Sequence, residues 1–79
     1  MTKEQLLKTG KELQLELTEI KNEIPESVMG VYAQIEFSLK MVLTSLDISE
    51  EINKKSIKKI QETYKDIDLF LMEIDKLSD

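Results

Sequence analysis

The chain has 79 residues, 41% of them hydrophobic, and its 11 Lys and 16 acidic residues give a formal net charge of −5. It contains no Cys or His, which excludes disulfides, structural zinc sites and catalysis by a thiol or an imidazole, and an acidic balance without Arg argues against nucleic-acid binding. We therefore expect one domain over residues 1–79 that is not an enzyme and has no cofactor, metal or small-molecule substrate.

The sequence also bears on location. No stretch approaches the roughly 18 consecutive apolar residues that a membrane span needs. The first five residues are polar or charged apart from Met1, and no apolar core of a signal peptide follows them. These features predict a cytoplasmic protein without a membrane span. The alternative is a protein that is secreted without a cleaved signal peptide.

The first predicted helix covers residues near 3–23. Thr2 and Gln5 form a capping-box pattern, in which each side chain can bond to the backbone amide of the other residue. Apolar residues and one glycine then recur at spacings of 4, 3, 4, 3 and 4, which is the period of a helix and not of a strand. This buried row, or seam, consists of Leu6, Gly10, Leu13, Leu17, Ile20 and Ile24.

Pro25 marks the end of this helix. Proline lacks an amide hydrogen and costs about 3 kcal/mol inside a helix, but it is tolerated at the first position of a new one. We therefore expect a break before Pro25 and a second helix near 26–46. The alternative is one long helix, near 3–45, that is kinked at Pro25.

The second predicted helix is apolar on most of its circumference. Its seam has the same spacing, and only Glu36 and Lys40 are charged between Val28 and Leu46. A helix of this composition is typically buried on several sides, which predicts that it is the central one. The seam residues are Val28, Tyr32, Ile35, Leu39, Val42 and Leu46.

The third predicted helix covers residues near 50–77. Asp47 or Ser49 can cap its start, and Asn53 falls on its seam, where a polar residue can fix the register or simply be exposed. The seam continues as Ile57, Ile60, Tyr64, Ile67, Leu71 and Ile74. Together the three seams predict an all-α fold, a small antiparallel three-helix bundle. The alternative is a kinked helical hairpin that completes a four-helix bundle with a second chain.

Helix lengths predict a docking surface. A third helix of 28 residues is about 42 Å long against about 30 Å for the second, so it should pass the end of the bundle by roughly two turns. Apolar residues spread over several faces of that end, which is typical of an interaction site. We expect Leu69, Phe70, Met72 and Leu77 to dock on a partner or on a second copy. A later start of the third helix, or cover from the first helix, would remove this overhang.

Two short patterns resemble a known group of proteins. Tyr64 and Asp68 match the Tyr-x-x-x-Asp/Glu signal found near the C-terminus of type VII secretion substrates, and Gly30 stands where a shortened Trp-x-Gly turn would fall. The chain thus resembles the WXG family of helical hairpins and the helical partners of LXG toxins. It departs from them in lacking the Trp, and Tyr32 with Glu36 repeats the Tyr signal in mid-chain. The resemblance implies that Tyr64 and Asp68 act in secretion.

These observations lead to one main functional hypothesis. The chain is expected to be a non-enzymatic protein–protein interaction module, of the adaptor, inhibitor or immunity type, that docks a helical surface on another protein. One alternative is a WXG-like helical partner or targeting factor for a type VII secretion substrate. Another is a structural bundle that completes its core by binding a second copy of itself.

Overall fold

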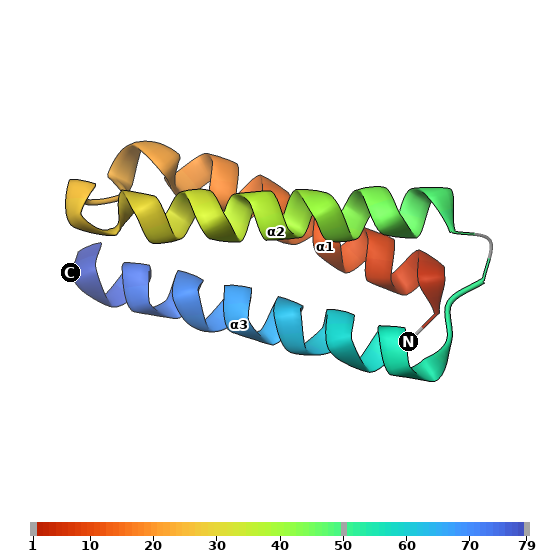
Figure 1. Ribbon diagram of the computed structural model, residues 1–79. Helices are drawn as coiled ribbons and strands as arrows, with labels where there is room; N and C mark the ends of the chain where they lie inside the picture. Colours follow the sequence, from red (N-terminus) through yellow and green to blue (C-terminus); the bar gives the residue numbers. More distant parts are fainter. Residues whose placement is uncertain (1, 50, 79) are drawn as a thin grey trace.

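The computed structural model describes residues 2–49 and 51–78. Within these ranges the chain forms three α-helices, two short 3₁₀ turns and no strand. The elements are α1 (Lys3–Ile20), η1 (Lys21–Glu23), η2 (Glu26–Val28), α2 (Met29–Ile48) and α3 (Lys54–Ser78). Figure 1 shows the helices running alternately up and down along one elongated bundle. The predicted all-α three-helix bundle is confirmed, and the kinked hairpin is wrong.

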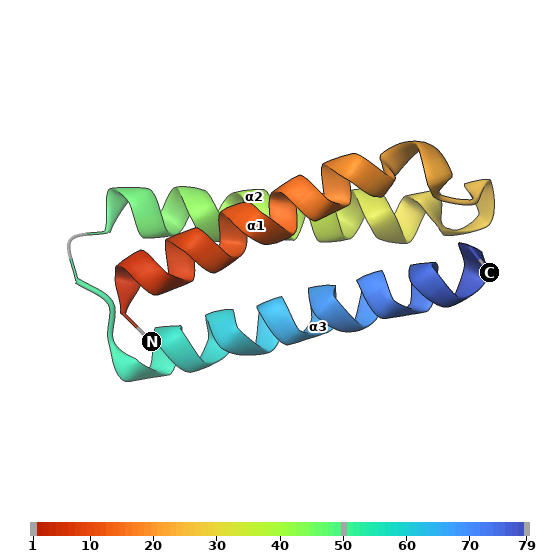
Figure 2. The same cartoon turned by 180° about the vertical axis from the view of Figure 1, so that it is seen from behind.

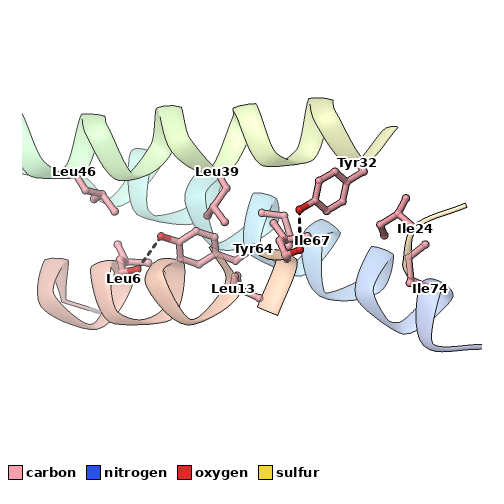
Figure 3. Packing of buried hydrophobic residues seen from close by; sticks show 10 residues of the cluster. Leu6, Leu13, Ile24, Tyr32, Leu39, Leu46, Tyr64, Ile67 and Ile74 are labelled. Carbon is pink, nitrogen blue, oxygen red and sulfur yellow. Dashed lines mark hydrogen bonds between the residues drawn. The ribbon is translucent and has the colours of Figure 1, made fainter. Parts of the chain in front are cut away.

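The predicted seams form the core. Ten hydrophobic side chains drawn from all three seams are buried in one cluster, and the remaining seam residues pack against it. The buried ten are Leu6, Leu13, Leu17, Ile24, Tyr32, Leu39, Leu46, Tyr64, Ile67 and Ile74. Figure 3 shows nine of them, labelled, pointing from the helices and the first connection into the shared interior. The 3.6-residue helical period therefore placed the core correctly.

The first connection is a true break at Pro25. Ile24 and Pro25 both adopt extended backbone angles, with φ −72° and ψ 123° at Ile24 and φ −61° and ψ 145° at Pro25. Pro25 caps the 3₁₀ turn η2, so α2 starts at Met29 and not at residue 26. The side chain of Ile24 is buried, which means that the connection closes this end of the core.

The start of α3 differs from the predicted position. The helix begins at Lys54, because Asn53 and not Asp47 or Ser49 provides its cap. The side-chain oxygen of Asn53 accepts a hydrogen bond from the amide of Ser56 at 2.8 Å, and its carbonyl accepts one from Ile57 at 3.1 Å. Asn is among the best residues at this position. Asp47 belongs to α2 instead, and Ser49 is the residue that ends it.

The predicted overhang of the third helix is also wrong, because α3 begins later than predicted. With 25 residues beginning at Lys54, α3 ends beside the connection between α1 and α2 (Figure 1). Ile74 near that end is buried in the same cluster as Ile24, and Figure 3 draws the two side chains close together. The connection between α1 and α2 therefore packs against the end of α3, which the longer predicted helix would have left free.

Two tyrosines attach α1 to the other helices. The hydroxyl of Tyr64 on α3 donates a hydrogen bond to the carbonyl oxygen of Leu6 at 2.8 Å, and that of Tyr32 on α2 donates to Leu17 at 2.7 Å (Figure 3). Figure 2 agrees with these two attachments, because α1 is tilted, with its first turns drawn nearer α3 and its last turns nearer α2. Each buried ring thereby contributes apolar area and a satisfied hydroxyl.

Gly10 allows the close approach of α1 to these partners. A Cβ atom built on Gly10 would lie 2.5 Å from the hydroxyl oxygen of Tyr64 and 2.6 Å from Cδ2 of Leu43. Both distances are far shorter than ordinary van der Waals contacts. Gly10 is therefore required by packing, although glycine costs about 1 kcal/mol of helix propensity relative to Ala.

We expect Gly10→Ala to lower the free energy of unfolding by about 1–3 kcal/mol, because overpacking outweighs the gain in helix propensity. Urea denaturation followed by circular dichroism measures the change. Gly30→Ala is the matched control, since nothing lies within 4 Å of a Cβ built there. Equal effects of the two substitutions would contradict the packing role of Gly10.

The tyrosines also predict a response to alkaline pH. Burial raises the pKa of Tyr64, and burial together with the nearby Glu36 carboxylate raises the pKa of Tyr32. The unfolded chain therefore loses these protons first, near the ordinary pKa of 10.0. Their contribution to stability is complete below pH 10 and is lost as the pH rises through the higher folded-state values.

We expect Tyr64→Phe to be less stable than the parent at pH 7 by about 0.5–1.5 kcal/mol, because one buried hydrogen bond is lost. The difference should shrink above pH 10, where the parent alone loses the contribution of Tyr64. Lysine titration affects both chains equally, so the comparison isolates the tyrosine. A stability difference that stays constant up to the highest pH would contradict this account.

Candidate functional site

The helix α2 carries a second row of residues with helical spacing, on the side opposite the core. This outer stripe lies at intervals of 4, 3, 4, 3 and 4, the same spacing as the buried seam of the helix. At about 100° per residue the two rows face opposite directions. All members of the outer stripe are exposed, and they are Gly30, Gln34, Phe37, Met41, Thr44 and Ile48.

The outer stripe contains three large apolar side chains and no charge. Phe37 is 65% exposed, Met41 53% and Ile48 78%. The charged residues of α2 are Glu36, Lys40 and Asp47, and their positions in the sequence place them together on one flank of the stripe. A surface helix normally has its charges on the outward face. In α2 the outward face is the one without charge.

A shallow groove between α2 and α3 borders the outer stripe. Its volume is about 470 Å³, and the side chains of Phe37 and Met41 form part of its α2 wall. Thr63 and Asp66 line the α3 side. The apolar surface of the stripe therefore continues into a hollow that a bound side chain can enter.

The expectation that the second helix is buried on several sides is wrong. Leu43 packs partly against the core beside Gly10, but the rest of the apolar surface outside the seam lies in solvent. With only two neighbouring helices, α2 has contacts along one seam and its margins. The sequence did contain a signal for this arrangement, since Phe37 and Met41 are spaced for a second helical face.

The residues predicted to dock a partner do not form one surface. Leu69, Met72 and Leu77 are exposed, but Phe70 is partly buried and packs against the core. Its ring centroid lies 6.4 Å from that of Tyr32, with the planes tilted by 45°. Met72 instead borders a groove between α1 and α3 that is rich in carboxylates. Phe70 is therefore packed in part against the bundle, on a different side of α3 from Met72.

We expect Phe70→Asp to lower the free energy of unfolding by about 1–3 kcal/mol, because it places a charge against the core beside Tyr32. Leu69→Asp, one residue earlier and exposed, should change it by no more than about 0.5 kcal/mol. Thermal and urea denaturation of the two variants measure the difference. If Phe70→Asp is as stable as Leu69→Asp, the contact between Phe70 and Tyr32 does not contribute to folding.

The residues of the secretion-like pattern lie in different environments. Tyr64 is buried and bonded to the backbone of Leu6, whereas Asp68 is exposed at the mouth of a groove beside Glu12 and Glu16. Tyr32 in the second copy of the pattern is buried as well. Both tyrosine rings are thus buried in the folded bundle, and Tyr64 forms part of the lining of the same groove as Asp68.

Across positions 2–49 and 51–78, no group of three or more His, Cys, Asp or Glu side chains is placed to hold a metal ion. In the same part of the chain no helix combines the length and apolar character needed to cross a bilayer. Comparison with known protein families, curated proteins and solved structures found no match.

Proposed function

We propose that this protein is a non-enzymatic interaction module, of the adaptor or inhibitor type, that binds another protein chain on the outer stripe of α2. The observation that carries the proposal is the uncharged outward face of that helix, with Phe37, Met41 and Ile48 largely exposed. A row of large exposed apolar side chains without charges on a small domain is typical of a binding site. Aromatic and Met side chains are also enriched at protein interfaces.

The spacing of the stripe suits recognition of a helix or a helix-binding groove. Phe37, Met41 and Ile48 stand at positions i, i+4 and i+11 of one helix face, close to the anchor pattern of amphipathic helices that bind in grooves. Phe37 and Met41 also line the groove between α2 and α3. A partner can therefore contact the stripe and insert a side chain beside it.

The rigidity of the bundle supports the same proposal. The stripe belongs to a 20-residue helix whose opposite face is fixed in the core by Tyr32, Leu39 and Leu46. The backbone positions from which its side chains project are thus fixed before binding, which lowers the entropy cost of association.

Photo-crosslinking tests the docking surface directly. A photoreactive phenylalanine analogue at Phe37 should give a covalent adduct with a protein chain in cells of the native host, because that side chain lies at the centre of the stripe. Leu15 on α1 is the matched control, since it is 60% exposed and apolar but lies on another helix. The same analogue at Leu15 should give little or no adduct.

Either of two results would exclude the outer stripe as the docking surface. One is the absence of any adduct at position 37. The other is equal yields at positions 15 and 37, which would show that exposure alone explains the reaction. The mass of the adduct identifies the chain that was bound.

A further inference from the structure

We propose that the occupant of the outer stripe is a second copy of this chain, with the two α2 helices packed antiparallel about a two-fold axis. This inference rests on the proposed function of the stripe and names its partner. The argument depends on the order of residues along the stripe, because a surface that binds its own copy must be complementary to itself.

The stripe has the required symmetry about a point beside Leu39. In an antiparallel pair centred there, each residue of the stripe meets the stripe residue whose number brings the sum to 78, which gives three pairs. Phe37 meets Met41 of the second copy, Gln34 meets Thr44, and Gly30 meets Ile48. Each of these contacts occurs twice, once on each side of the axis.

The central and intermediate contacts are chemically matched. Phe37 and Met41 place an aromatic ring against a thioether, a favourable contact that also removes the largest apolar area of the stripe from water. Thr44 already donates its hydroxyl hydrogen to the carbonyl oxygen of Lys40 at 2.9 Å. Its lone pairs remain able to accept a hydrogen bond from the amide group of Gln34 in the second copy.

The contact between Gly30 and Ile48 gives a reason for the glycine at position 30, and no feature of the single chain provides one. Gly30 has no positive φ, and a Cβ built on it meets open space. Neither backbone conformation nor packing thus requires a glycine there, although it costs about 1 kcal/mol of helix propensity. In the antiparallel pair Gly30 faces Ile48, the most exposed large apolar side chain that the structure describes. The missing side chain makes room for it.

The flanks of the stripe set the salt dependence of the pair. On one flank Ser38 lies across from Ser38, and neither is charged. On the other flank Lys40 lies near both Lys40 and Glu36 of the second copy, because Glu36 shares that flank. The repulsion and the attraction oppose each other, and dissolved salt screens both. The pair should therefore change little in strength as ionic strength rises.

A parallel pair lacks this complementarity. It would place Gly30 opposite Gly30 and leave a gap, and it would stack Ile48 on Ile48 at the other end. Phe37 would face Phe37 with Met41 facing Met41. The small residue would then no longer lie opposite the large one.

The size of the surface is adequate. A stable interface buries about 800 Å² on each partner, roughly 13% of the accessible surface of 6074 Å². The Cα atoms extend over 41 × 18 × 17 Å, and α2 runs along the long axis (Figure 1). The stripe runs from Gly30 to Ile48, about 27 Å along α2. A 79-residue chain that has no Cys for disulfides also belongs to the size class that commonly gains stability from association.

Sedimentation velocity and light scattering of the full chain test the pair. We expect a species of twice 9.2 kDa whose stability changes little with added salt. Phe37→Asp should weaken dimerisation by about 30-fold or more while helicity is retained. Gly30→Leu should weaken it as well, although the single chain has open space for the new side chain. Leu15→Asp on α1 should leave the dimer unchanged.

Engineered cysteines test the antiparallel register, since the chain has none of its own. The two Ile48 residues lie about 27 Å apart along the axis in the antiparallel pair. Chains with Ile48→Cys should therefore not link to each other on mild oxidation, but should link to chains with Gly30→Cys when the two are mixed. Rapid linking of Ile48→Cys chains among themselves would overturn the register.

The outcomes separate this inference from the proposed function. A chain that stays monomeric at its highest soluble concentration, with a photo-adduct at Phe37 to a different protein, rejects the second copy and retains the docking surface. A monomeric chain without any adduct rejects both. A dimer that is unaffected by Phe37→Asp and Gly30→Leu rejects the stripe as its interface.

Discussion

Each helix of a three-helix bundle contacts its two neighbours along one seam, and the rest of its circumference faces water. This constraint determines most of what the structure shows. The seams of α1 and α3 supply the buried side chains of those helices, and charged residues occupy much of their outer faces, although Leu15 on α1 and Leu69, Met72 and Leu77 on α3 are also exposed. Helix α2 has more apolar residues than one seam can bury, so Phe37 and Met41 remain outside. The candidate binding surface is thus a direct result of how few helices the chain has.

The sequence predicted the buried core more accurately than the exposed surface. Helical periodicity located every buried side chain, because burial of one face imposes the same spacing on any helix. The start of α3 was harder to predict from the sequence, because Asp47, Ser49 and Asn53 are all good helix caps. Only the tertiary path of the connection selects among them. The second helix was expected to be buried on several sides and is not, because composition identifies apolar faces but not the number of helices available to cover them.

The two glycines show the same limit at single positions. Gly10 and Gly30 both lie within helices and look equivalent in the sequence. Gly10 has the hydroxyl of Tyr64 and the side chain of Leu43 against it, whereas Gly30 has open space. Only the positions of residues far away in the chain distinguish a glycine that is needed for packing from one that leaves a surface flat. The sequence therefore predicts where the helices lie better than it predicts which surfaces bind other molecules.

The tyrosine bonds have a consequence for how freely this protein can change. Tyr64 and Tyr32 donate to main-chain carbonyls at Leu6 and Leu17, and a carbonyl is present whatever side chain the residue carries. No compensating substitution in α1 is needed to preserve these two attachments. The solvent-facing residues of α1 can accordingly be replaced extensively, by natural drift or by an engineer adding labels or new binding residues, while the helix keeps its place in the bundle.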